Sequence, residues 1–403
     1  MMNFVNSENM LERALKIIPN GTQTFSKSRT QYPIGASPFY LTRGKGSHVW
    51  DVDRNEYIDF VSGLTAIILG YADPDVDGAV SEQMKDGVIF SLPHPLEVEV
   101  SELICEMVPC AEMVRFGKNG SDVTAGAIRV ARAHTGGEIV ACCGYHGWQD
   151  WYVGVTGRNL GIPQAIRGLT KTFNYNDIDS LHRIFRDNPS QVACVILEPM
   201  NSEWPKEGFL EEVKEITHKN GAILVFDEVI TGFRFALGGA QEFFKVIPDI
   251  ACFGKAIANG YPLSAIAGKA EIMESMKAIH FSFTNAGECL SLAAAKATLN
   301  KIKKDDVPEK LFQIGTNIKG HIEKPLDGHP SWLFWKTDNQ IDKTKFIQEF
   351  IQDEILSIGT FNINASHSWG DIIRLAKSFN RIQENLGEIE LKCQPLNQLF
   401  RIR

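Results

Sequence analysis

The stretch PDIACFGKAIANGYP, residues 248–262, places a lysine directly behind a short apolar run. Residues 250–253 are typical of a buried strand, Gly254 follows them, and Lys255 stands where the strand ends. A charged amine at such a place is costly unless it has a partner or a chemical role. The sequence around Lys255 therefore bears on both the fold and the chemistry.

Similar apolar runs occur at four other places, namely EIVACC (138–143), VACVIL (192–197), AILVF (222–226) and SAIAG (264–268). Segments with a helical pattern separate most of them, for example GFLEEVKEITHKN at 208–220. Near-continuous apolar strands that alternate with helices are typical of a mostly parallel sheet covered on both faces. We therefore expect an α/β fold in which each of these runs is a parallel strand.

The flanking segments predict a second, smaller part of the chain. Residues 10–18 predict a short amphipathic helix, and residues 48–61 predict a β-hairpin. Beyond about residue 300 the chain becomes more charged, and a long helix is expected over 343–359. These patterns favour an N-terminal segment (1–60) that packs with the small domain, a large domain (61–298) and a small α+β C-terminal domain (299–403).

Composition and charge exclude several classes of partner. The 403 residues are 44% apolar and 22% charged, as in an ordinary globular enzyme. A net charge of -8 argues against nucleic acid or an anionic membrane surface as the main partner. No apolar run is long enough to span a bilayer, and the eight cysteines include no C-x-x-C pair. We expect a cytoplasmic protein with free thiols.

One stretch resembles a calcium-binding loop. DVDRNEYIDFVS, residues 51–62, begins with the alternating oxygen ligands of an EF-hand. Its sixth position is Glu56, where glycine is needed, and its twelfth is Ser62, where a bidentate glutamate is needed. The alternating apolar residues favour a hairpin, so we predict no metal site.

Reactive side chains follow the predicted strands. Tyr145 and His146 follow EIVACC, Glu198 follows VACVIL, and Asp227 follows AILVF. Lys255 follows the run at residues 250–253. Carboxyl ends of parallel strands meet at one edge of a sheet. A desolvated lysine can lose its proton and condense with an aldehyde, and a buried aspartate needs a cation. Pyridoxal 5'-phosphate (PLP) meets both needs, because its aldehyde can condense with the lysine and its protonated ring nitrogen is a cation for the aspartate. Either residue alone would favour a structural ion pair.

A candidate phosphate site decides between these two interpretations. In GKNGSDVTAGAIRVARAHTGG, residues 117–137, Asn119, Gly120 and Ser121 stand at the start of a predicted helix. Gly120 lets the backbone approach an anion, Ser121 adds a hydroxyl, and the helix start adds unpaired N–H groups. The segment matches neither a Walker A loop nor a G-x-G-x-x-G motif. We expect it to hold the phosphate of PLP.

The run LVFDEVITGFRFALGGAQEFFKVIPDIACFGKAIANGYPLSAIAGKAEIM, residues 224–273, resembles class III PLP-dependent aminotransferases, in particular their glutamate-1-semialdehyde aminomutase branch. The resemblance covers residues 20–300 well. It implies a fold-type I PLP-dependent transferase that moves an amino group from a small-molecule donor to an aldehyde or ketone acceptor through a lysine Schiff base. It also implies a homodimer with the active site at the subunit interface.

The resemblance assigns roles to individual residues. Lys255 matches the Schiff-base lysine, and Asp227 matches the partner of the pyridine nitrogen. Val229 and Tyr145 match the residues on the two faces of the ring, and Thr284 in FSFTNAGE matches a threonine that reaches the neighbouring subunit's phosphate. The remaining cofactor-binding candidates are the cup residues, with His146 and Glu198 as orienting or structural partners: Asn119, Gly120, Ser121, His146, Glu198.

Substrate contacts depart from the aminomutase branch. That branch has an arginine for the substrate carboxylate, where this chain has Lys27, with Thr24 nearby. Trp50 is a further candidate substrate residue, and Glu288 with Cys289 replaces an Asn-Pro pair. Lysine lacks the bidentate fork of arginine, so the aminomutase substrate is not implied.

Several alternatives stay open. Amino-group transfer is the main hypothesis, intramolecular exchange on glutamate-1-semialdehyde is the second, and a non-catalytic subunit with this fold is the third. A racemase or decarboxylase would use the same cofactor. Trp148 and Trp151 could stack on a flat substrate, but we favour packing roles for both. Arg234 is compatible with either a rim carboxylate site or a structural ion pair.

Overall fold

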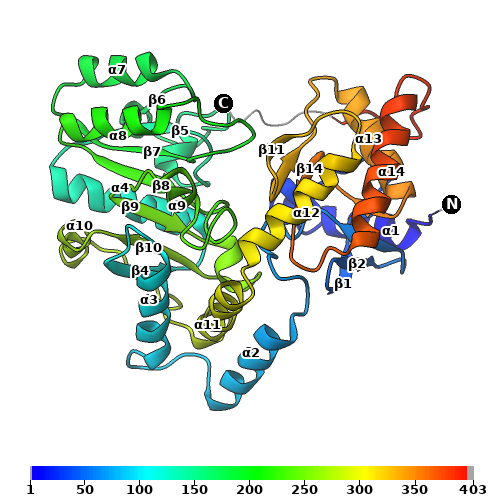
Figure 1. Ribbon diagram of the computed structural model, residues 1–403, viewed down its shortest axis with the longest axis horizontal. Coiled ribbons are helices and arrows are strands. Elements are labelled where there is room, and N and C mark those ends of the chain that lie inside the picture. Colours follow the sequence, from blue (N-terminus) through cyan, green and yellow to red (C-terminus); the bar gives the residue numbers. More distant parts are fainter. Residues whose placement is uncertain (1, 397–403) are drawn as a thin grey trace. The chain divides into compact units, whose positions relative to one another are not determined.

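The predicted strands pair into one seven-stranded sheet in the computed structural model, which describes residues 2–396. The strand order is β4-β10-β9-β8-β7-β5-β6 (Figure 1). Its strands are β4 (Met113–Gly117), β5 (Ile139–Cys143), β6 (Thr170–Thr172), β7 (Val192–Leu197), β8 (Ile223–Asp227), β9 (Ile250–Phe253) and β10 (Ser264–Gly268). Strands β9, β8, β7, β5 and β6 run parallel, so the prediction of a mostly parallel sheet is confirmed.

Strand β10 corrects one part of that prediction, because it runs antiparallel to both β9 and β4. Only residues 254–263 separate it from β9, and part of them forms the short 3-10 helix η3 (Lys255–Ala258). A parallel return needs a crossover of a dozen or more residues. The chain therefore turns back on itself, and SAIAG is a buried antiparallel strand.

Helices cover both faces of the sheet, as expected from its apolar strands. Side chains alternate along β5, so that Val140 and Cys142 pack with α4 (Gly120–Thr135). Ile139 and Ala141 pack on the opposite face with α7 (Ile178–Asp187) and α8 (Phe209–Lys219) (Figure 1). The two apolar clusters exclude water from both sides of the sheet, which is the main stabilising term of this region.

The chain divides into two compact units, a large unit (Pro74–Pro308) and a small unit formed by the segments before Pro74 and after Pro308. The sequence-based division into 1–60, 61–298 and 299–403 stays a prediction, and residues 397–403 lie outside the described part. The remaining helices of the large unit are α2 (Pro74–Asp86), α3 (Pro95–Met107), α5 (Asp150–Val153), α6 (Gln164–Gly168), α9 (Ala240–Phe244), α10 (Ala270–Met273), η4 (Glu274–Lys277) and α11 (Cys289–Lys304).

The small unit contains two short sheets within the described residues. One has the order β1-β2-β3-β13, and the other has the order β11-β12-β14. Its elements are α1 (Val5–Leu15), η1 (Pro19–Gly21), η2 (Phe25–Lys27), β1 (Leu41–Lys45), β2 (His48–Asp51), β3 (Glu56–Asp59), β11 (Asp327–His329), β12 (Trp332–Phe334), α13 (Gln340–Gln352), β13 (Ile355–Leu356), β14 (Thr360–Asn362) and α14 (Trp369–Asn385). Helix α12 (Val307–His321) crosses the division between the units.

The predicted hairpin is confirmed as β2 and β3, and its turn explains the calcium-like pattern. Asp51 accepts hydrogen bonds from the backbone N–H groups of Asp53 and Asn55 at 2.9 and 2.8 Å, and from the Tyr57 hydroxyl at 2.8 Å. This carboxylate is thus engaged in closing the turn. No group of potential metal ligands occurs among the residues that the structure describes.

Two helix predictions need correction. The helix expected at 10–18 is α1, which starts earlier and ends before the proline turn. The helix expected over 343–359 ends at Gln352, because Glu354 adopts the left-handed conformation with φ of 60°. Ile355 and Leu356 then pair as strand β13 with Ile58 and Asp59. Long-range pairing thus replaces the local helical preference.

Two further findings concern the cysteines and the length of the apolar helices. All eight cysteines are free, as expected. Within residues 2–396, none of the helices is both long and apolar enough to pass through a bilayer. The cytoplasmic location stays a prediction from the sequence.

Asp249 joins three elements at the amino-terminal edge of the parallel strands. Its carboxylate accepts hydrogen bonds from Leu224 N at 2.8 Å, from Lys269 Nζ at 2.7 Å and from His218 Nε2 at 2.8 Å. Burial opposes the charged form, but the three donors outweigh it and lower the pKa of Asp249. The ionised carboxylate therefore stabilises the start of β8 and β9.

We expect Asp249→Asn to destabilise the protein at pH 7 by about 1 to 3 kcal/mol, because charged hydrogen bonds are lost. The folded pKa lies below the unfolded value near 3.9, so this contribution is present above about pH 4 and disappears as the pH falls further. Urea unfolding midpoints at pH 7 and in steps down to pH 3 measure the difference. Glu82→Gln, in an exposed helix pair, is the control and should change little. A difference that grows at low pH would contradict the assignment.

Candidate functional site

The register of the sheet brings the predicted strand ends to one edge. Cys143 lies opposite Leu197, Leu197 opposite Phe226, and Asp227 opposite Cys252. Strand β4 ends at the same edge, because Gly117 pairs with Ser264, the first residue of the antiparallel β10. Helix α4 begins three residues after Gly117. Its first turn therefore stands beside the carboxyl ends of the parallel strands.

A buried histidine and a buried aspartate make the central contact of this edge. His146 Nδ1 lies 2.7 Å from Asp227 Oδ2, and His146 Nε2 lies 3.0 Å from the Cys143 carbonyl oxygen. Burial alone would lower the pKa of His146, but its neighbours Cys142 and Asp227 raise it well above the usual value. A protonated His146 donates to both acceptors and thereby orients the Asp227 carboxyl group.

A second buried carboxyl group lies close to this pair. Glu198 Oε2 accepts hydrogen bonds from Tyr145 N at 3.0 Å and from Asn201 Nδ2 at 2.8 Å. Burial raises the pKa of Glu198, and the charge of Asp227 raises it further. Asn201 was not predicted from the sequence, although its position three residues after the strand-end Glu198 is a usable signal. This pair fixes the backbone at Tyr145.

Lys255 is half-buried at the start of η3 and has a φ of 45°. The left-handed conformation costs a residue with a side chain roughly 1 to 2 kcal/mol, and such strain clusters at functional sites. Burial lowers the pKa of Lys255 to about 8, although Asp227 and Glu198 favour its charged form. Among the described residues its amine has no hydrogen-bond partner. Lys255 thus offers a nucleophilic amine near neutral pH.

The start of α4 has the features of an anion site. The backbone N–H groups of Gly120 and Ser121 have no acceptor among the described residues, while Asp122 accepts from Asn119 N at 2.7 Å. A Cβ atom on Gly120 would lie 2.9 Å from Val229 Cγ1. Only glycine lets the turn after β8 pack this closely on the helix start. The unpaired donors and the helix dipole favour an anion here.

The segment after β5 closes around this helix start. Gly147 has a φ of +100°, and a Cβ atom there would lie 2.5 Å from Ser121 Cβ. Tyr145 is exposed, and its ring packs edge-on against Tyr152 at 5.6 Å. An exposed aromatic ring at this position can cover a flat ligand.

The two tryptophans of this segment differ from each other. Trp151 is buried and stacks on His146 with ring centroids 5.9 Å apart, so its packing role is confirmed. Trp148 is 66% exposed, so the interpretation of packing is wrong for it. In the sequence, Trp148 follows Gly147, which has a positive φ, and precedes α5. Arg234 is fully buried, which places its guanidinium away from an exposed rim.

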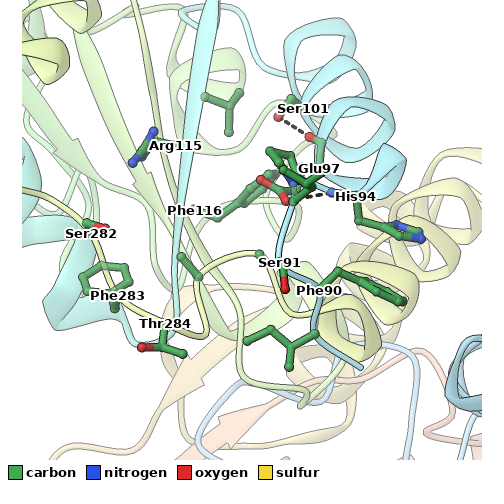
Figure 2. A pocket seen from close by; sticks show the side chains of 16 residues that line it. Phe90, Ser91, His94, Glu97, Ser101, Arg115, Phe116, Ser282, Phe283 and Thr284 are labelled. Carbon is green, nitrogen blue, oxygen red and sulfur yellow. Dashed lines mark hydrogen bonds between the residues drawn. The ribbon is translucent and has the colours of Figure 1, made fainter. Parts of the chain in front are cut away.

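The remaining candidates lie elsewhere. Thr284 lines a pocket of about 550 Å³ in the large unit. In Figure 2, Ser282, Phe283 and Thr284 lie on one side of it, and Phe90 and His94 lie on the other.

Three substrate candidates belong to the small unit, and their role stays a prediction. Thr24 and Lys27 are exposed in and beside η2. Trp50 is half-buried in β2, where the guanidinium of Arg43 lies 4.6 Å from its ring centroid.

The residues at the strand ends, namely Lys255, Asp227 and the start of α4, combine three chemical functions. A half-buried amine with a lowered pKa can attack an aldehyde, and an ionised buried carboxylate can hold a proton on a basic nitrogen. Unpaired backbone donors at a helix start can bind a phosphate. All three requirements of a phosphorylated aldehyde with a pyridine ring are met by residues present here.

Comparison with known proteins agrees with this geometry. The family model described as aminotransferase class-III matches residues 31–330. The chain is 37% identical over 334 residues to a 3-aminobutyryl-CoA aminotransferase of Cloacimonas acidaminovorans, covering 81% of this chain and 80% of that protein. It is also 37% identical over 342 residues to a glutamate-1-semialdehyde 2,1-aminomutase of Syntrophomonas wolfei, covering 80% and 79%.

Solved structures extend the similarity over nearly the whole chain. The FumI protein of Sphingopyxis sp. MTA144, solved in its PLP internal aldimine form, superposes with a TM-score of 0.89 at 25% identity. The match covers 97% of this chain and 99% of that one. The expected fold-type I architecture is therefore confirmed.

The lowered pKa of Lys255 gives a test that needs no substrate. In cofactor-free protein, we expect trace labelling of Lys255 by acetic anhydride to rise with a midpoint near pH 8, because burial disfavours its ammonium form. An ordinary lysine has a midpoint near 10.4. Removing the charge of Asp227 in Asp227→Asn should move the midpoint below 8. Mass spectrometry of peptides measures the labelling, and the exposed Lys219 reports reagent reactivity. A midpoint above 10 would contradict the assignment.

Proposed function

The chain belongs to the class-III aminotransferase family, and on that premise we propose that it moves an amino group from a small amine donor to an aldehyde or ketone acceptor with pyridoxal 5'-phosphate as cofactor. It is an enzyme of this family, which argues against the hypothesis of a non-catalytic subunit. The observation that carries the proposal is Lys255, an unpaired amine with lowered pKa beside the buried Asp227.

Each side chain at the strand ends has a place in holding the cofactor. The N–H groups of Gly120 and Ser121 would bind its phosphate, and Asp227 would hold the proton on its ring nitrogen. Val229 and Tyr145 would lie on the two faces of the ring. When bound, PLP supplies an aldehyde that takes up the amino group and a ring that accepts electrons from the substrate α-carbon. His146 orients the Asp227 carboxyl group for this purpose.

Proton movement is the task of Lys255. With a pKa near 8, its Nζ is able both to accept a proton from the substrate carbon and to return one at neutral pH. The left-handed backbone at Lys255 fixes the direction from which the amine approaches. Burial of Asp227 and Glu198 keeps bulk water from competing for these protons.

The similar proteins carry out two different reactions, amino-group transfer between two substrates and amino-group exchange within one substrate. One similar protein is named for an aminotransferase and another for an aminomutase. We favour transfer between separate donor and acceptor, because this chain has Lys27 where the aminomutase branch has an arginine. Glutamate-1-semialdehyde supplied alone distinguishes them. Conversion without a second substrate supports the mutase, and a strict requirement for both partners supports the transferase.

Replacing the amine should abolish catalysis. We expect Lys255→Ala to reduce turnover by at least about a thousandfold, because both nucleophile and proton carrier are lost. The variant should retain a bound phosphate ester but lose the yellow colour of the loaded enzyme. Lys219→Ala, at an exposed site of α8, is the control and should keep full activity. A Lys255→Ala enzyme with wild-type turnover would refute the assignment.

A homodimer completes the proposal. The pocket around Thr284 is bordered by exposed apolar side chains, among them Ile89, Phe90, Leu92 and Phe283 (Figure 2). Clusters of exposed apolar residues typically mark an interface. We propose that a second copy covers this surface and that Thr284 reaches the phosphate held by the neighbouring subunit.

We expect light scattering of the wild type to give twice the 44.9 kDa of one chain. Leu92→Glu should shift the protein toward monomer, since a charge then replaces an apolar contact that is 80% exposed in the single chain. Leu160→Glu is the matched control, because Leu160 is 95% exposed and does not line the pocket. A Leu92→Glu protein that stays dimeric at low micromolar concentration would contradict this surface as the interface.

A further inference from the structure

A mostly buried ion pair joins two segments of the large unit that carry phosphate candidates. Lys118 Nζ lies 2.9 Å from Glu288 Oε1, and only 16% and 13% of the two side chains are exposed. Lys118 stands between β4 and Asn119, directly before the helix start described above. Glu288 follows the segment 282–287, which carries Thr284. Neither Lys118 nor Glu288 is one of the proposed contacts to the cofactor or the substrate.

Glu288 is held rigidly by its other contacts. It is the N-cap of α11, and its carboxylate accepts hydrogen bonds from Leu290 N at 2.9 Å and from Ser291 N at 3.1 Å. The Ser291 hydroxyl also donates to it. Burial opposes its charge, but Ser291 and Lys118 outweigh burial and lower the pKa of Glu288. The carboxylate is thus a fixed, ionised anchor at the end of the segment.

Lys118 is anchored in the turn that begins α4. Asp122 Oδ2 accepts hydrogen bonds from Lys118 N at 3.2 Å and from Asn119 N at 2.7 Å. These bonds set the path of the backbone whose next N–H groups are the unpaired donors of Gly120 and Ser121. A movement of this turn therefore moves the root of the Lys118 side chain.

The segment 282–287 is held locally by the hydrogen bond from Ala286 N to the Phe283 carbonyl oxygen at 3.1 Å and by the edge-on contact of Phe283 with Phe281. Residues 282–285 are exposed, whereas Cys289 N donates to the Val88 carbonyl oxygen at 2.8 Å just behind them. The ion pair links Glu288, directly behind this segment, to Lys118, directly before the start of α4. Because both charges are largely removed from water, breaking the pair leaves one of them unpaired, which gives this link more weight than a surface pair.

We propose that Lys118 and Glu288 are positioning residues that couple phosphate binding at the start of α4 to the placement of the segment 282–287. Occupation of the Gly120 and Ser121 donors fixes the turn, the turn fixes Lys118, and Glu288 transmits this to Thr284. This inference rests on the proposed function and deepens it. It assigns a positioning role to Glu288, the residue near Thr284 that departs from the family pattern.

A direct electrostatic role makes the opposite prediction for one variant. If Lys118 bound the phosphate itself and Glu288 only weakened its charge, Glu288→Gln would tighten binding of PLP. Coupling by position predicts that Glu288→Gln and Lys118→Met both weaken binding. The geometry favours coupling, since the amine of Lys118 is already bonded to the fixed carboxylate.

The test compares cofactor-free and PLP-loaded protein by hydrogen–deuterium exchange and by titration with PLP. In the wild type we expect PLP to slow exchange in peptides covering 282–287. Lys118→Met and Glu288→Gln should each lose this protection and raise the dissociation constant of PLP by roughly fivefold or more. The double variant should bind no more weakly than the singles. A purely structural role would instead change exchange equally in both states.

Lys296→Met is the matched control, because it removes a lysine–glutamate pair from the same helix α11. That pair, with Glu99, is 44% and 43% exposed, and the variant should behave as the wild type. Unchanged PLP binding and protection in Lys118→Met would overturn the coupling, as would tighter binding in Glu288→Gln. A wild type that binds no PLP would instead overturn the proposed function itself.

Discussion

The hydrogen bond between His146 and Asp227 is the contact on which the site depends. It joins the end of β8 to the turn after β5, across the intervening β7. Both side chains are buried, so breaking this contact would leave a buried polar group without its partner. The contact fixes the Asp227 carboxyl group at the edge of the sheet. The remaining groups are arranged around that carboxyl group.

Lys255 shows how two opposing effects set reactivity. The carboxylates of Asp227 and Glu198 favour its ammonium form, but removal from water is the larger effect. Less burial would leave an ordinary, protonated lysine, while loss of the carboxylates would leave an amine too weakly basic to carry a proton. The sheet edge therefore holds the amine between these limits, with a strained backbone that directs it.

Sequence reasoning could locate the strand-end group because it rests on two strong regularities. Apolar runs such as VACVIL predict parallel strands, and the carboxyl ends of parallel strands lie at one edge of the sheet. Glu198, Asp227 and Lys255 could therefore be grouped from the sequence alone. The antiparallel course of β10 depends on the short connection after Lys255, which apolar composition does not reveal. Strand β13 and the Lys118–Glu288 pair depend on partners far along the chain. Local propensity carries no information about such pairs.

The edge position of β4 has a consequence for how the protein is made. Among the described strands, β4 pairs with β10 alone, and the residues of β10 are translated roughly 150 positions later. Pairs so distant in sequence close slowly, because much chain entropy is lost before the contact forms. On the ribosome, the β4–α4 turn thus has no strand to rest on until residue 268 has emerged. A nascent chain therefore completes the β4–α4 turn only after most of the large unit has been synthesised.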